Sequence, residues 1–166
     1  MSTLRIAGTI PESIVDGPGI RYVLFTQGCP HSCPGCHNPQ THDFAGGREV
    51  QVSDLLTDIT RRSFVKAVTL SGGEPFCQPA PLAELAAALK EKGFHLMCYS
   101  GFTFEELLQK EDACPLLEQL DLLVDGRFVE SRKNIELRFR GSDNQRVLDV
   151  PASLAAGSAV WCEKYR

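Results

Sequence analysis

The feature that most limits the fold of this chain is a regular alternation of short apolar strand patterns with helical patterns of about ten residues. The strand patterns cover residues 20–27, 65–70, 94–99 and 120–124, with a weaker one at 146–150. Such alternation is typical of βα units with a parallel sheet. A complete eightfold βα barrel takes about 250 residues. The 166 residues present therefore predict an α/β fold, an open, partial (βα) barrel of about four to six mostly parallel strands.

Each conspicuous motif comes directly after one of these strand patterns. A cysteine-rich loop over residues 28–47 follows the first strand, and Ser71-Gly-Gly-Glu-Pro75 follows the second. Tyr99-Ser-Gly101 and Asp125-Gly126 follow the next two. In parallel α/β sheets, ligands bind at the carboxyl ends of the strands. The sequence therefore predicts that these motifs share one functional edge of the sheet.

Length and composition narrow the class of protein further. The length predicts one domain over residues 1–166, with an irregular tail from about residue 151. Seventeen basic and 21 acidic residues give a net charge of −4, which does not favour nucleic-acid binding. No run of about 18 apolar residues predicts a membrane span. The odd number of cysteines, seven, together with the lack of a signal-peptide pattern, indicates a cytoplasmic chain with free thiols or metal ligands.

The cysteine loop places three thiols within eight residues, since Cys29, Cys33 and Cys36 have the spacing CxxxCxxC. Structural zinc is one interpretation, but such a site takes four ligands and no second CxxC or HxxxH pair lies downstream. A redox dithiol at Cys33 and Cys36 is another, and it leaves Cys29 unexplained. An iron–sulfur cubane, normally held by four thiolates, would use all three and keep one iron free for a ligand.

These motifs together resemble those of a known superfamily. CxxxCxxC followed by the Gly-Gly-Glu-Pro turn resembles the radical S-adenosylmethionine (SAM) superfamily. Asp16-Gly-Pro-Gly-Ile-Arg21 and Cys36-His-Asn-Pro39 resemble the members that activate glycyl radical enzymes. Residues 123–128 and 140–145 are similar to the anaerobic ribonucleoside-triphosphate reductase activating proteins, and the resemblance covers about residues 10–150.

The resemblance implies a radical SAM oxidoreductase whose [4Fe-4S] cluster is held by Cys29, Cys33 and Cys36. It would cleave SAM reductively and take a hydrogen atom from a glycine Cα of a glycyl radical enzyme, for which anaerobic ribonucleoside-triphosphate reductase is the first candidate. Flavodoxin or a thiol system would supply the electron, and no nucleic acid or membrane is involved. An activator of the pyruvate formate-lyase type and a small-molecule enzyme such as a deazaguanine synthase are alternatives. A non-enzymatic zinc or electron-transfer module is a more distant one.

The resemblance also implies which residues contact SAM. They are Gly35, Cys36, His37, Gly72, Gly73, Glu74, Ser100, Asp125, Arg127 and Arg140. Gly72 and Gly73 would let the backbone approach the methionine amino group without a Cβ in the way, while Glu74 braces the turn. Gly35 stands where many superfamily members carry an aromatic residue, so His37 is the candidate for contact with the adenine.

The remaining candidates lie at later strand ends and in the last third of the chain. Asp125, with Arg127 two positions later, matches an acidic strand end that lies near the cofactor, sometimes with a monovalent cation. Arg140 is a candidate for the SAM carboxylate or ribose, because a guanidinium pairs well with a carboxylate. Trp161 and Tyr165 are expected to pack the tail onto the domain or onto a partner. The other four cysteines are scattered, so no auxiliary cluster is expected.

Overall fold

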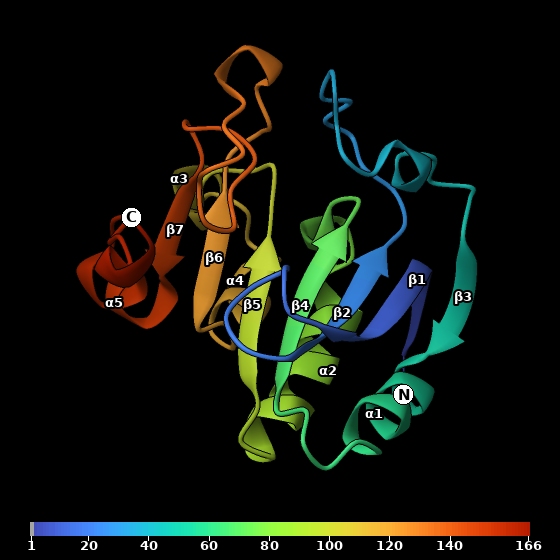
Figure 1. The fold of residues 1–166 in the computed structure, drawn as a ribbon. Coiled ribbons are helices and arrows are strands. Elements are labelled where there is room, and N and C mark those ends of the chain that lie inside the picture. Colours follow the sequence, from blue (N-terminus) through green and yellow to red (C-terminus); the bar gives the residue numbers. More distant parts are fainter. Residues whose placement is uncertain (1) are drawn as a thin grey trace.

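One mixed β-sheet runs through the protein in the strand order β3-β1-β2-β4-β5-β6-β7 (Figure 1). The computed structural model describes residues 2–166. The four central strands pair in parallel: β2 (Arg21–Thr26), β4 (Ala67–Gly72), β5 (His95–Tyr99) and β6 (Leu122–Asp125). Antiparallel strands extend both edges: β1 (Thr3–Ser13), β3 (Arg48–Gln51) and β7 (Arg146–Asp149). The α/β class with a mostly parallel centre is confirmed, and the sheet has seven strands where about four to six were expected.

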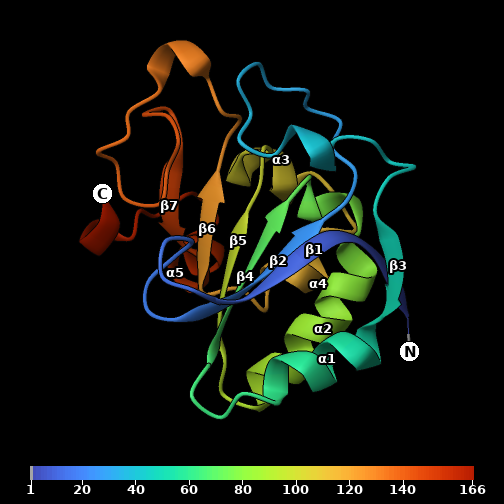
Figure 2. The same ribbon diagram turned by 45° about the vertical axis from the view of Figure 1, so that its right-hand side comes forward.

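Within residues 2–166, four helices lie in the connections between the parallel strands, and a fifth follows β7. They are α1 (Val52–Thr60), α2 (Pro79–Glu91), α3 (Phe104–Leu108), α4 (Cys114–Leu117) and α5 (Val150–Ala156). Short 3-10 turns are η1 (Pro39–Thr41), η2 (Pro75–Cys77), η3 (Glu130–Arg132) and η4 (Glu163–Tyr165). Helices α1 and α2 lie side by side on one face of the sheet (Figure 2). Among residues 2–166, no helix is long and apolar enough to cross a membrane.

The two faces of the parallel strands have different roles. Leu24, Leu70 and Cys98 belong to the main core beneath the helices. Because successive side chains of a strand point to opposite faces, their neighbours in sequence face the other way. Two of these neighbours, Phe25 and Tyr99, line a cavity on that opposite face. The period of two along the strands therefore separates a buried core from a surface that can bind a ligand.

The tail from about residue 151 is not irregular throughout, because it begins with helix α5. Helix α5 forms because Asp149 accepts a hydrogen bond from Ala152 N at 3.0 Å as its N-cap, and Gly157 ends it in the left-handed conformation with φ 70°. The segment after the helix then returns to β7, where Cys162 N donates to Val147 O at 2.9 Å. Tyr165 is buried in a second apolar cluster with Met97 and Val147 on the cavity face of the sheet.

Candidate iron–sulfur and cofactor site

The cysteine loop leaves the carboxyl end of β2 and is closed at its base by backbone hydrogen bonds. Gly28 N donates to Thr41 O at 2.7 Å, and Cys29 N donates to His42 O at 3.1 Å. The loop and the segment after β6 both lie beyond the ends of the parallel strands (Figure 1). Residues 28–47 are confirmed as a loop, interrupted only by η1. The motifs that follow separate strands therefore meet at one edge of the sheet.

The three loop thiols suit an iron–sulfur cluster. Cys29, Cys33 and Cys36 are all free and partly exposed. Burial is the main cause that raises the pKa of Cys29 and of Cys33, so both thiols need a metal to hold them as thiolates near neutral pH. Within residues 2–166, no three His, Cys, Asp or Glu side chains are placed to hold one metal ion. Three thiols on one short loop are the kind of donor that an iron–sulfur cubane uses.

The Gly-Gly-Glu-Pro turn at the end of β4 is joined directly to the cysteine loop. Gly73 N donates to Thr26 O and Glu74 N donates to Gly28 O, both at 2.8 Å. Gly72 has φ 95°, and a Cβ there would collide with the backbone of Thr26. Glycine is required at this position because the turn and the end of β2 approach backbone to backbone.

The Glu74 side chain is fully buried and points away from the cavity. Its carboxylate accepts hydrogen bonds at 2.7–3.0 Å from His31 Nε2, Gly101 N, Ser100 Oγ and Phe76 N. The ring of His31, between the first two cysteines of the loop, also meets Phe102 edge to face at 4.6 Å. Glu74 therefore connects the cysteine loop with the ends of β4 and β5.

A cavity of about 470 Å³ lies against the cysteine loop on the sheet face opposite the helices. Four of the expected cofactor residues line it: Cys36, His37, Gly72 and Arg140. Its volume is within the range of about 300–1,000 Å³ that is typical of small-molecule sites. Part of its wall is formed by the aromatic side chains of Phe25, Tyr99 and Phe128. Cys36, an expected ligand of the cluster, therefore lies at the wall of a cavity large enough for a small molecule.

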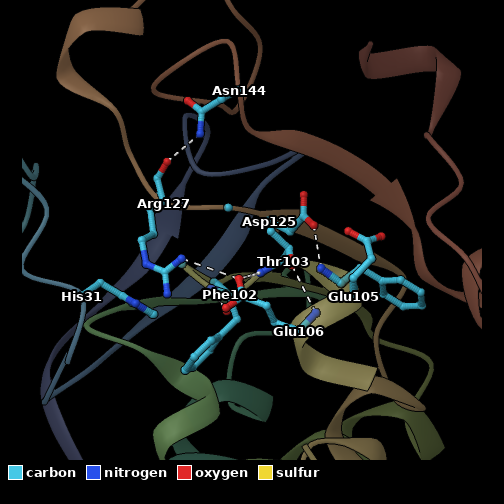
Figure 3. A network of polar contacts seen from close by, with 12 residues as sticks. His31, Phe102, Thr103, Glu105, Glu106, Asp125, Arg127 and Asn144 are labelled. Carbon is cyan, nitrogen blue, oxygen red and sulfur yellow. Dashed lines mark hydrogen bonds and ion pairs between the residues drawn. The ribbon is translucent and has the colours of Figure 1, made fainter. Parts of the chain in front are cut away.

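The other expected cofactor residues lie outside the cavity lining. Asp125 is buried, and its carboxylate accepts from Phe104 N at 2.7 Å and from Arg146 Nε at 3.0 Å. Arg127 is half exposed and pairs with Glu106 at 3.6 Å, as Figure 3 shows. The remaining four sit in the turns behind the cavity or in the cysteine loop: Gly35, Gly73, Glu74 and Ser100. Their contact with SAM stays a prediction.

Sequence reasoning missed several residues that shape this site. His31 showed no ligand spacing and instead bonds to Glu74, while Arg146 neutralises Asp125 from a strand 21 positions further along the chain. Phe128 packs against His37, with ring centroids 5.2 Å apart. Phe128 ends the motif of residues 123–128, which was the available signal for it. The other two partnerships join residues distant in sequence.

Arg21 anchors the turn at residues 16–19, which borders the cavity through Asp16. Its buried guanidinium donates to Thr69 Oγ1 at 2.7 Å and to Val68 O and Pro18 O, both at 2.9 Å. Burial lowers the pKa of Arg21 to about 10. The guanidinium also lies 3.0 Å from His95 Nδ1, and its planar fork is held in place because its donors meet several acceptors.

Arg21→Lys is expected to lower the free energy of unfolding by about 2–4 kcal/mol, because the ammonium group cannot reach all of these acceptors. Chemical denaturation of the metal-free protein, followed by circular dichroism, measures the change. Arg48→Lys is the matched control, because Arg48 is exposed at the sheet edge, and it should change stability by less than about 0.5 kcal/mol. Equal stability of the two variants would contradict the anchoring role of Arg21.

The fold and the cysteine loop define the class of protein. A family model described as a 4Fe-4S single cluster domain matches residues 15–148. The chain is 33% identical over 146 residues to the anaerobic ribonucleoside-triphosphate reductase-activating protein of Enterobacteria phage T4, with 82% of this chain and 88% of that one covered. The protein of the same name from Vibrio cholerae is 36% identical over 148 residues, covering 81% and 91%. The chain therefore belongs to the family of anaerobic ribonucleoside-triphosphate reductase-activating proteins, as its motifs indicated.

A second group of relatives is also similar. The pyruvate formate-lyase-activating enzyme of Clostridium pasteurianum is 41% identical over 117 residues, which cover 65% of this chain and 49% of that enzyme. The chain thus spans about half the length of this relative.

Proposed function

We propose that this chain is a radical SAM activase that prepares a glycyl radical enzyme, and that its partner is an anaerobic ribonucleoside-triphosphate reductase. The observation that carries the proposal is the contact between a three-thiol loop and a cavity of about 470 Å³ that Cys36 itself lines. When bound, the cluster supplies the electron that cleaves the carbon–sulfur bond of SAM. The names of the reductase-activating relatives support the choice of partner.

The residues of the chain bind and orient the cofactor. Cys29, Cys33 and Cys36 hold the cluster, and three thiolates leave one iron of a cubane without a protein ligand. Gly72 exposes the end of β4 to the methionine amino group, and the Arg140 guanidinium binds the carboxylate. The aromatic side chains of the wall offer apolar surface to the cofactor. No proton transfer by a side chain is needed for this chemistry.

The partner is proposed to reach the cavity from the side of the β1–β2 turn. Ile10 and Val15 line the cavity there, and Ile14 and Val15 each expose 75% of their surface. An apolar rim next to a catalytic cavity suits a docked protein segment better than a small substrate. A glycine loop of the partner would therefore pass over these side chains on its way to the SAM methylene.

Three finer points belong to the same proposal. Flavodoxin or a thiol system would supply the electron. The cytoplasm is the compartment, because a cluster needs its thiolates reduced. A monovalent cation near Asp125 would have to share this carboxylate with Arg146, which already donates to both of its oxygens at 3.0 and 2.5 Å.

The proposed activity has a direct test. Anaerobically reconstituted protein with dithionite is expected to convert SAM to 5′-deoxyadenosine, measured by chromatography. Added ribonucleoside-triphosphate reductase should then show a glycyl radical signal by electron paramagnetic resonance. Cluster-loaded protein that cleaves no SAM would overturn the activity.

An activator of the pyruvate formate-lyase type is the second candidate, and the Clostridium pasteurianum relative favours it. Pyruvate formate-lyase, assayed in parallel with the reductase, separates the two. A glycyl radical on the lyase alone would show that the lyase is the partner, and the proposed reaction with SAM would still hold. A radical on the reductase alone would support the first candidate.

A further inference from the structure

Arg140 carries a polar group that the protein leaves without a partner. Its NH1 donates to Gln145 O at 3.1 Å, whereas its Nε is buried and has no hydrogen-bond partner among residues 2–166. Leaving such a donor unpaired costs about 1–3 kcal/mol. Because Arg140 lines the cavity, its guanidinium can pair with a carboxylate of a ligand there.

The side chain of Arg140 is held from behind by the C-terminal tail. Its guanidinium carbon lies 5.2 Å from the ring centroid of Trp161, and that of Arg166 lies 4.9 Å from the same ring. Trp161 is fixed in turn on β7, where it forms an isolated bridge with Leu148. A guanidinium stacked on an aromatic ring gains about 0.5–2 kcal/mol, more where water is excluded. The ring therefore restricts where the guanidinium can point.

The neighbouring cavity residue is held by the tail in the same way. Phe139 has φ 62°, in the left-handed region. This conformation costs a bulky residue energy and persists only where the surrounding structure holds it. Its ring meets Tyr165 edge to face at 5.3 Å, and the guanidinium of Arg138 lies over both rings. Two aromatic residues of the tail thus stand behind two consecutive residues of the cavity wall.

We propose that the part of the tail after α5, residues 157–166, is a positioning element for SAM. In this element Trp161 orients Arg140 to receive the SAM carboxylate. This inference rests on the proposed function, because it takes SAM to be the ligand. The tail lies beyond the region that the 4Fe-4S family model matches, which ends at residue 148. Trp161 and Tyr165 are positioning residues, and Arg140 makes the contact.

The test compares binding of SAM with binding of its decarboxylated analogue to oxidised, cluster-loaded protein by calorimetry. Trp161→Ala is expected to raise the Kd for SAM about 3- to 30-fold, which corresponds to the loss of about 0.5–2 kcal/mol. The Kd for the decarboxylated analogue should change less than about 2-fold, because that ligand has no carboxylate for Arg140. In turnover, KM should rise while kcat at saturating SAM stays within about 2-fold.

Two matched variants keep this test specific. Trp161→Phe retains an aromatic ring and should restore most of the affinity, whereas Ser158→Ala changes an exposed residue of the same tail and should bind as the wild type does. Since Trp161 is the only tryptophan, the fluorescence emission of the protein reports on this ring. The emission maximum should shift when SAM binds, and Arg140→Ala should remove that shift.

The outcomes separate the two proposals. Wild-type protein that binds no SAM would overturn the proposed function. Wild-type protein that binds SAM, together with a Trp161→Ala variant that is weakened equally for both ligands or for neither, would overturn the positioning role alone.

Discussion

Replacement of Cys29, Cys33 or Cys36 by alanine is expected to lower dithionite-dependent cleavage of SAM by at least about 100-fold. Each thiolate of a cubane binds its own iron, so no neighbouring residue can replace a missing one. Both remaining thiols lie on a loop that is partly exposed to solvent, where a two-thiolate cluster is open to loss. Iron and sulfide contents should fall together with 5′-deoxyadenosine formation.

Cys114→Ala is the matched control for these three variants. Cys114 is also a free thiol, but it is exposed at the start of α4, where its Sγ donates to Glu118 at 3.2 Å. Its removal should leave iron content and turnover within about 2-fold of the wild type. Full iron content and full turnover in any of the three loop variants would contradict the assignment of the cluster ligands.

Glu74→Ala is expected to lower the free energy of unfolding of the metal-free protein by about 3–5 kcal/mol. The substitution leaves several buried donors without their acceptor, among them His31 Nε2, Ser100 Oγ and Gly101 N. It also removes the side-chain connection between the cysteine loop and the ends of β4 and β5. Chemical denaturation measures the stability, and the yield of cluster reconstitution measures the effect on the loop.

Two further variants separate stability from cluster binding. Glu111→Ala removes an exposed carboxylate and should change stability by less than about 0.5 kcal/mol. His31→Ala leaves the other donors of Glu74 satisfied, so it should cost about 1–3 kcal/mol and still reduce cluster retention. Wild-type stability and cluster yield in Glu74→Ala would show that this carboxylate does not brace the site.

The parallel centre of the fold could be predicted because most residues of its strands are buried and the strands therefore read as short apolar runs. The antiparallel edges gave weaker signals. Strand β1 contains Gly8 and Pro11 and is irregular between Ile6 and Gly8, and β3 has only Val50 as an apolar residue. Pairing of β1 with β2 and of β3 with β1, rather than local preference, stabilises this side of the sheet. Helix α5 did carry a local signal, because Asp149-Val-Pro151 is a typical helix start and Gly157 is a typical helix end.

The site was predictable where its chemistry is local and unpredictable where it is not. Cysteine spacing and a glycine turn are properties of short segments, so Cys36 and Gly72 could be assigned to the cavity edge from sequence. The bond between His31 and Glu74 joins residues 43 positions apart, and the stacking of Arg140 on Trp161 depends on how the tail returns to β7. Such pairs are set by the tertiary fold and leave no periodic pattern in the sequence.

The closed base of the cysteine loop affects how the metal-free protein takes up a cluster. The bonds of Gly28 to Thr41 and of Glu74 to His31 order the loop when the chain folds, before any metal arrives. Conformational freedom that is already lost does not oppose the insertion of a cluster. Loss of the cluster is therefore expected to leave the base of the loop folded, so that iron and sulfide can be inserted again without refolding of the chain.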